Sequence, residues 1–172
     1  MHSLIRLIEG ITSRTGFLVA LAIIPLVMTS VYEVFARYAF GAPTSWAFEI
    51  GYMITGTHFL IGAAITLARN DHVRIDIAYA SFAPKTQAIV MALFYVVLLL
   101  PFLAMLNEAL WHYALNALAS GEKSGQSGWN PPIWPFRCLL ALGFSLLALQ
   151  VIAETLKCVS TLRDTPYSNA EI

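Results

Sequence analysis

The sequence predicts an all-α integral membrane protein with four transmembrane helices and short interfacial helices. Apolar residues make up 58% of the 172 residues and charged residues 12%, about half of the roughly 25% typical of soluble domains. A helix needs about 20 apolar residues to cross a hydrocarbon core of roughly 30 Å. Four continuous apolar stretches are near that length: 16–32, 50–68, 88–106 and 133–153. They do not alternate with polar residues, which argues against a β-barrel.

The four stretches predict one membrane domain over residues 1–172. We place the spans at about 15–37, 46–68, 87–118 (with an apolar core at 88–106) and 132–156. Almost no chain is left for a soluble domain, so we expect no enzyme, no catalytic residue, no cofactor and no metal site. The formal net charge is zero, and nothing suggests nucleic acid as a partner.

The first span follows a mildly amphipathic segment, 1–14, which predicts a short interfacial helix. Pro25 removes a backbone donor and frees the carbonyl of Leu21, so we expect a kink there. The helix should continue to about Tyr38. Glu33 and Arg37 are four residues apart in the favourable order and can form an ion pair.

A tight turn over residues 40–45 separates the first and second helices. Thr44 or Ser45 is expected to cap the second helix, and Trp46 to anchor it at headgroup depth. Glu49 falls in the first helical turn, where the helix dipole favours an anion. Glu49 and Arg37 can pair with each other or contact another subunit.

Small and hydroxyl-bearing residues form a stripe along the second helix. Its members recur at steps of four, three, four and four: Gly51, Thr55, His58, Gly62 and Thr66. Lipid offers no hydrophobic reason for such a stripe, whereas small residues let another helix approach closely and hydroxyls bond across the gap. The stripe therefore predicts a face that packs against protein.

His58 lies near the middle of its span, where an ionisable residue suggests a function. Three roles remain open. It can be a neutral imidazole that hydrogen-bonds a neighbouring helix, a coupled proton or partner sensor, or a ligand of a metal or haem.

The second-to-third connection is rich in charge, notably Arg69, His72, Arg74 and Asp76. It can be a solvated turn or an architectural contact with another subunit. We expect a short amphipathic helix along the membrane surface here, ended by Pro84.

The third span contains Pro101, which frees the carbonyl of Val97 and predicts a second kink. A loop over residues 120–128 follows, and the fourth helix starts near a group of prolines. Arg137 is expected to snorkel outward, while Glu154 and Lys157 mark the other end of this helix. Cys138 and Cys158 are about 30 Å apart along that helix, too far for a disulfide.

Basic residues predict the orientation. Seven lie in the N-terminus, the second-to-third connection and the C-terminus, against three on the other side. The positive-inside rule therefore places both termini in the cytoplasm.

Two blocks of the chain resemble the small membrane subunit of tripartite ATP-independent periplasmic (TRAP) transporters. The first runs from Arg37-Tyr38 through Phe40-Gly41-Ala42-Pro43, Trp46, Glu49 and Gly62-Ala63-Ala64 to Arg69-Asn70-Asp71-His72-Val73-Arg74-Ile75-Asp76. The second is Pro132-Ile133-Trp134-Pro135, then Leu142-Gly143 and Leu149-Gln150. With the four expected helices, the resemblance covers most of the chain.

The resemblance implies a non-catalytic subunit of a secondary, sodium-coupled uptake system in the bacterial inner membrane. Such a subunit supports a large multi-span membrane subunit that contains the substrate and sodium sites. A soluble periplasmic binding protein delivers the substrate, often an organic acid, to the pair. The absence of an inverted repeat in this sequence agrees with a chain that does not transport alone.

Two alternatives come from other classes. A b-type cytochrome anchor needs two axial ligands at similar depth, and His58 and His112 differ in depth by roughly 22 Å. A free-standing channel or exporter needs polar linings on several helices, and only the second span has a sustained polar stripe.

Overall fold

The computed structural model describes residues 2–69 and 82–163 and is helical almost throughout. Within these residues, four helical stretches are long and apolar enough to cross a membrane: Ser3–Ala39, Ala47–Ala68, Lys85–Ser120 and Trp134–Leu162. The elements are α1 (His2–Leu21), α2 (Ile23–Ala39), α3 (Ala47–Ala68), α5 (Pro84–Leu93), the π-helix η1 (Phe94–Leu99), α6 (Leu100–Ser120) and α7 (Trp134–Arg163). The predicted all-α membrane class is confirmed.

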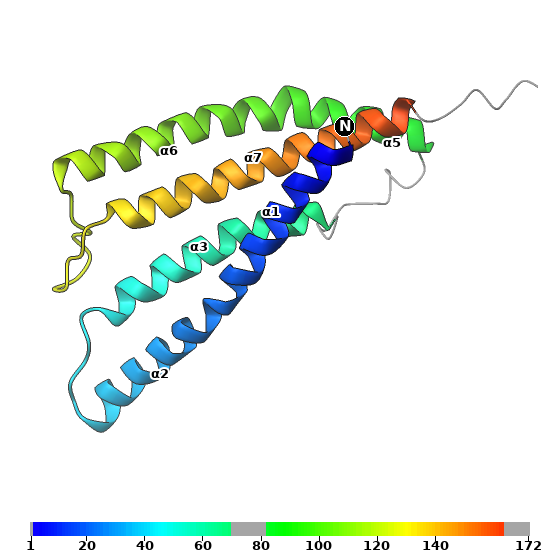
Figure 1. Cartoon of the computed structure of the whole chain (residues 1–172). Coiled ribbons are helices and arrows are strands. Elements are labelled where there is room, and N and C mark those ends of the chain that lie inside the picture. The colour runs from blue at the N-terminus through cyan, green and yellow to red at the C-terminus, as the bar shows by residue number, and fades with distance from the viewer. Residues whose placement is uncertain (1, 70–81, 164–172) are drawn as a thin grey trace, which may run out of the picture.

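Helix α7 is the centre of the arrangement. It packs along α6, α3, α5 and α1, and α1 also packs on α3 (Figure 1). The start of α1 and the end of α7 lie at one end of the bundle, which we call the terminal end. The connections 40–46 and 121–133 lie at the other, which we call the loop end.

The first span is interrupted at Ala22, where the backbone N–H bonds to Val19 O at 3.0 Å in a tighter turn. Pro25 cannot donate to the carbonyl of Leu21, so the expected interruption is present just before the proline. Residues 2–14 are helical as predicted, but they do not end as a short helix, because α1 runs unbroken from His2 to Leu21. Ile5, Ile8 and Thr12 are buried, and this packing keeps the N-terminal segment in one continuous helix.

The third span contains the π-helix at Phe94–Leu99, immediately before Pro101. Leu100 N bonds to Tyr95 O, five residues earlier. Pro101 cannot bond to Val97 O, so the turn before it widens and the predicted distortion takes the form of a π-helix. Pro84 begins α5; the amphipathic helix expected before it falls largely on residues 70–81, outside the described part.

The loop end differs from expectation in how α3 begins. Its N-cap is Trp46, with no side-chain capping bond. The expected cap by Thr44 or Ser45 is therefore wrong, and Thr44 bonds to Glu33 instead. At the other connection, Gly121 ends α6 with a φ of +64°, which glycine adopts without steric cost. Lys123 and Pro132 then form an isolated antiparallel bridge.

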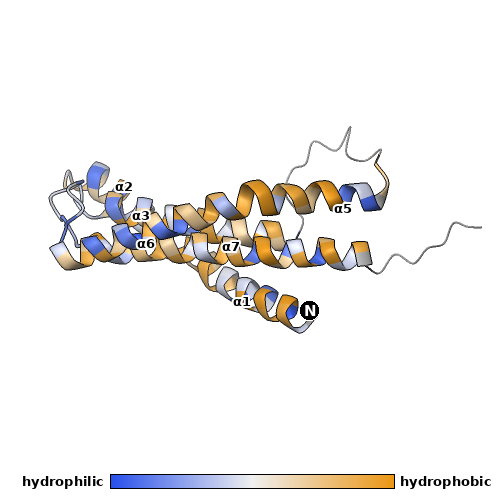
Figure 2. Cartoon of the chain, turned by 90° about the horizontal axis from the view of Figure 1, so that it is seen from above, coloured by the Kyte–Doolittle hydropathy of each residue, from blue (hydrophilic) through white to orange (hydrophobic). Residues whose placement is uncertain are grey.

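The core lies between α3, α7 and the third span. One cluster contains Leu67, Tyr95, Leu103 and Val151, and another Ile61, Ala64 and Leu146. Many large apolar side chains are exposed, and hydrophobic residues run along much of the length of the helices (Figure 2). A hydrocarbon environment explains such exposure, because lipid tails cover apolar surface that water would not.

Candidate functional site

The predicted stripe on α3 is not buried inside this chain. A Cβ built on Gly51 or Gly62 meets no atom of the described structure within 4 Å, and Thr55 is exposed. Helix α3 packs on α7 through a different face, where Gly56 meets Phe136 and Leu60 meets Gly143. The stripe therefore remains open at Gly51, Thr55 and Gly62 among the described residues.

His58, in the same stripe, contacts the first span. Its Nδ1 lies 3.2 Å from Val19 O, in the last turn of α1 before the interruption at Ala22. Nδ1 donates in this arrangement because a carbonyl only accepts. Of the three roles left open, the contact matches the hydrogen bond to a neighbouring helix.

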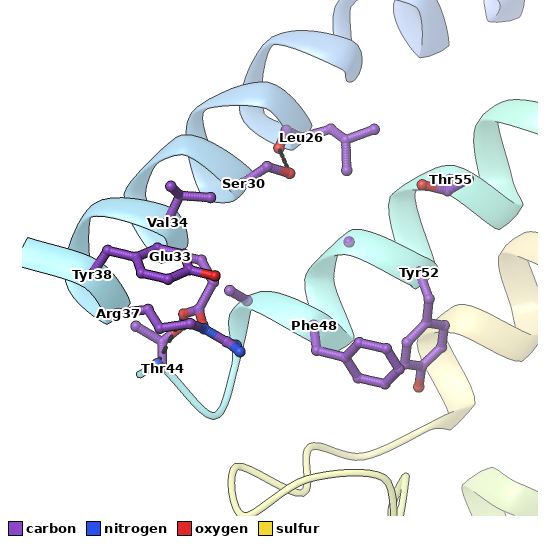
Figure 3. A pocket seen from close by; sticks show the side chains of 12 residues that line it. Leu26, Ser30, Glu33, Val34, Arg37, Tyr38, Thr44, Phe48, Tyr52 and Thr55 are labelled. Carbon is purple, nitrogen blue, oxygen red and sulfur yellow. Dashed lines mark hydrogen bonds and ion pairs between the residues drawn. The ribbon is translucent and has the colours of Figure 1, made fainter. Parts of the chain in front are cut away.

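A groove of about 560 Å³ lies between α2 and α3 beside the stripe. Figure 3 shows its two walls, with Leu26, Ser30 and Val34 on α2 and Phe48, Tyr52 and Thr55 on α3. Gly51 and Ala47 also line it. The groove therefore combines apolar side chains and small residues in a single concave surface.

An ion pair closes the groove at the loop end. Arg37 Nη2 lies 2.5 Å from Glu33 Oε1, so the predicted i,i+4 pair is confirmed. Glu33 Oε2 also accepts bonds from the Thr44 hydroxyl and from Thr44 N, the latter at 2.8 Å. The carboxylate thereby joins the end of α2 to the turn that leads into α3.

Glu49 does not pair with Arg37, so that expected pairing is wrong. Its carboxylate is fully buried and accepts a bond from the Ser127 hydroxyl in the loop between α6 and α7. Its other oxygen, Oε2, has no hydrogen-bond partner among the described residues. The rotation of α3 directs Glu49 to this loop, away from α2.

Trp46, at the start of α3, stacks on Tyr32 of α2, with ring centroids 5.6 Å apart.

Arg137 is the centre of a cluster that the sequence did not predict. Its side chain is buried rather than snorkelling outward, and it forms two bonds of 2.6 Å to Glu122. The guanidinium carbon lies 3.4 Å from the centroid of the Tyr113 ring, a cation–π contact. The bonds from Arg137 hold the pKa of the Glu122 carboxyl below its ordinary value.

A second unpredicted cluster joins α1 to α7 at the terminal end. We call it the α1–α7 clamp, and it consists of Glu9, Thr12, Gln150, Glu154 and Lys157. From the sequence, Glu154 and Lys157 were expected only to mark one end of the fourth helix, not to contact α1. The signal for the clamp was the recurrence of polar residues at 150, 154 and 157 on one side of α7.

A third polar network joins α6 to α7. Ser145 Oγ lies 2.7 Å from Asn107 Oδ1 and 3.2 Å from Trp111 Nε1. Interhelical polar contacts of this kind hold membrane helices together. Cys138 and Cys158, on α7, are not joined in a disulfide, as their separation predicted.

The charged connection is described only at its start. Arg69 follows α3 as its C-cap and is exposed. His72, Arg74 and Asp76 lie outside the described residues, so their roles stay predictions.

Comparison with known families decides the assignment. Residues 26–161, most of the chain, match the model of the tripartite ATP-independent periplasmic transporters, DctQ component. The chain belongs to the DctQ family. Comparison with curated proteins gives no match.

The DctQ match makes this chain a TRAP transporter component and a multi-pass membrane protein. It includes both walls of the groove, the open stripe and the Arg137 cluster. It begins after α1, so Glu9 and Thr12 of the clamp lie outside the matched region. The assignment favours the transporter interpretation over the haem anchor.

Proposed function

We propose that this DctQ-family chain is a non-catalytic scaffold that holds the large membrane subunit of a sodium-coupled TRAP uptake system. The observation that carries the proposal is the open stripe on α3. Among the described residues, no atom lies within 4 Å of a Cβ built on Gly51 or Gly62, although small residues in membranes serve to bring helices together. We infer that a helix of the large subunit lies along the stripe and the α2–α3 groove.

The scaffold role follows from how transport works. A large subunit that moves substrate through the bilayer needs a fixed neighbour against which its moving part can shift. This chain offers a bundle whose helices are joined by buried polar contacts and which has an apolar exterior. In the proposed arrangement, the chain lies in the bacterial inner membrane with both termini in the cytoplasm. The loop end then faces the periplasm and helps receive the binding protein that delivers an organic acid.

The test is to replace Gly51 and Gly62 with leucine, one at a time, in the complex. A Cβ at either position meets no atom of the described residues within 4 Å, so we expect normal insertion and thermal stability. We expect about tenfold less large subunit to co-purify, because leucine prevents close helix approach. Ala104→Leu on the exposed face of α6 is the control. Wild-type recovery of the large subunit with both glycine variants would refute this use of the stripe.

A further inference from the structure

We propose that the α1–α7 clamp is a positioning device that sets how the first span crosses the bundle, and thereby the width of the α2–α3 groove. The use of that groove by a partner rests on the proposed function. The geometric role of the clamp does not, and it is tested separately below.

The clamp is a continuous path of polar contacts between the two helices. Thr12 Oγ1 donates to Gln150 Oε1 at 3.1 Å, and Gln150 Nε2 donates to Glu154 Oε1 at 3.0 Å. Lys157 Nζ lies 2.6 Å from both Glu154 and Glu9. Two residues of α1 are thus bound to three of α7.

Burial makes the geometry of the clamp specific. Thr12 and Gln150 are fully buried, and Glu154 is 5% exposed. Apolar packing is non-directional and allows a helix to slide or rotate. A buried amide or carboxylate left without its partners is costly, so only one placement of α1 satisfies them all. Such polar contacts can specify one arrangement among several of similar packing.

Beyond the clamp, further contacts between α1 and α3 fix the position of the first span. Gly16 packs so closely on Ile65 of α3 that a Cβ there would lie 2.0 Å from Ile65 Cδ1. Val19 then meets His58, and the interruption at Ala22 follows. These contacts recur at steps of three and four residues after Glu9 and Thr12, so they share one face of α1.

Helix α2 has little packing of its own to fix its position. Ala36 is its one buried residue, and its contacts are chiefly with α3. At the loop end, the bond between Glu33 and Thr44 holds α2 in position. At its opposite end, α2 is held by its connection to α1. Because α2 forms one wall of the groove, a shift of α1 at the clamp changes the groove.

The experiment measures the distance between α2 and α7 in the full chain in lipid nanodiscs. Spin labels replace Val31 and Leu142, both exposed, after Cys138 and Cys158 are changed to alanine. Gln150→Leu and Lys157→Met each break the clamp. We expect both to shift the distance distribution to longer values and broaden it. Lys157→Arg keeps the charge and should restore the wild-type distribution.

Ser145→Ala is the matched control, because it removes a polar contact of α7 with α6 and leaves α1 untouched. Unchanged distances in both clamp variants would overturn the proposal, as would equal broadening by Ser145→Ala. If Gln150→Leu does not fold, the isosteric Thr12→Val tests the same link.

A second measurement separates the clamp from the proposed function. We expect Gln150→Leu to lower the recovery of the large subunit by about tenfold, as Gly51→Leu does. Normal recovery despite a shifted distance would overturn the link to partner binding while the clamp geometry stands. Normal recovery with Gly51→Leu and Gly62→Leu would instead refute the proposed function alone.

Discussion

Two arginines at the loop end form ion pairs in different surroundings. Arg37 is 56% exposed and pairs with Glu33 one helical turn earlier, so the pair is visible in the sequence. The Arg137 side chain is 8% exposed and pairs with Glu122 across the end of the bundle. Exposed pairs contribute little to stability, whereas the loss of one partner of a buried charge is costly.

At this residue scale we predict that Glu122→Gln lowers the thermal unfolding midpoint in detergent at neutral pH. It leaves the buried Arg137 guanidinium with Tyr113 and without its carboxylate. Because the folded-state pKa of Glu122 is lowered, the pair's contribution is complete above the ordinary glutamate pKa of about 4.3 and disappears as the pH falls through the lowered value.

The difference between wild type and Glu122→Gln should therefore be constant from about pH 6 to 8 and vanish in acid. Lys123→Gln, in the same loop and exposed, is the control for a general charge effect. A midpoint difference that does not decrease as the solution is acidified would contradict the assignment.

At the scale of the elements, the crossing of α1 over α3 depends on one close approach. Gly16 is buried against Ile65, while Gly10, earlier on α1, has no described atom within 4 Å of its Cβ position. Alanine favours a helix over glycine by roughly 0.5–1 kcal/mol at either site. At Gly16 alone, the added methyl group forces Ile65 to move.

We predict that Gly16→Ala destabilises the folded chain by about 1–3 kcal/mol through overpacking, while Gly10→Ala leaves it unchanged or slightly more stable. The measurement is the free energy of unfolding of both variants in the same detergent. Equal stability of the two variants would mean that α1 and α3 do not approach closely at Gly16.

At the scale of the whole molecule, the two ends of the bundle differ in their number of basic residues. By the bounds of the helices, the basic residues of the terminal end are Arg6, Arg14, Arg69, Lys85 and Lys157, and those of the loop end are Arg37, Lys123 and Arg137. Under the positive-inside rule, the excess of basic residues at the terminal end predicts that this end lies in the cytoplasm.

We predict that Ser127→Cys reacts with a membrane-impermeant maleimide in cells whose outer membrane alone is permeabilised, whereas Thr161→Cys reacts only after lysis. Both variants are made after Cys138 and Cys158 are changed to alanine, and the unsubstituted background is the control. The reverse labelling pattern would invert the proposed orientation.

The properties that depend on nearby residues could be predicted from the sequence. The four spans follow from the length of the apolar runs, the two helix distortions from Pro25 and Pro101, and the Glu33–Arg37 pair from its i,i+4 spacing. Each of these is decided within one helix, where the period of the backbone alone determines which groups meet.

Only the tertiary structure decided which groups meet between helices. Glu49 lies one turn into α3, and the rotation of that helix takes it to Ser127 rather than to Arg37. Glu9 reaches Lys157 because α1 crosses α7. Arg137 meets Glu122 because the two ends of the α6–α7 loop are held together by the Lys123–Pro132 bridge and by the bond from Ile133 N to Glu122 O. Packing sets the rotation and crossing of each helix through contacts far apart in the chain, and no local pattern records them.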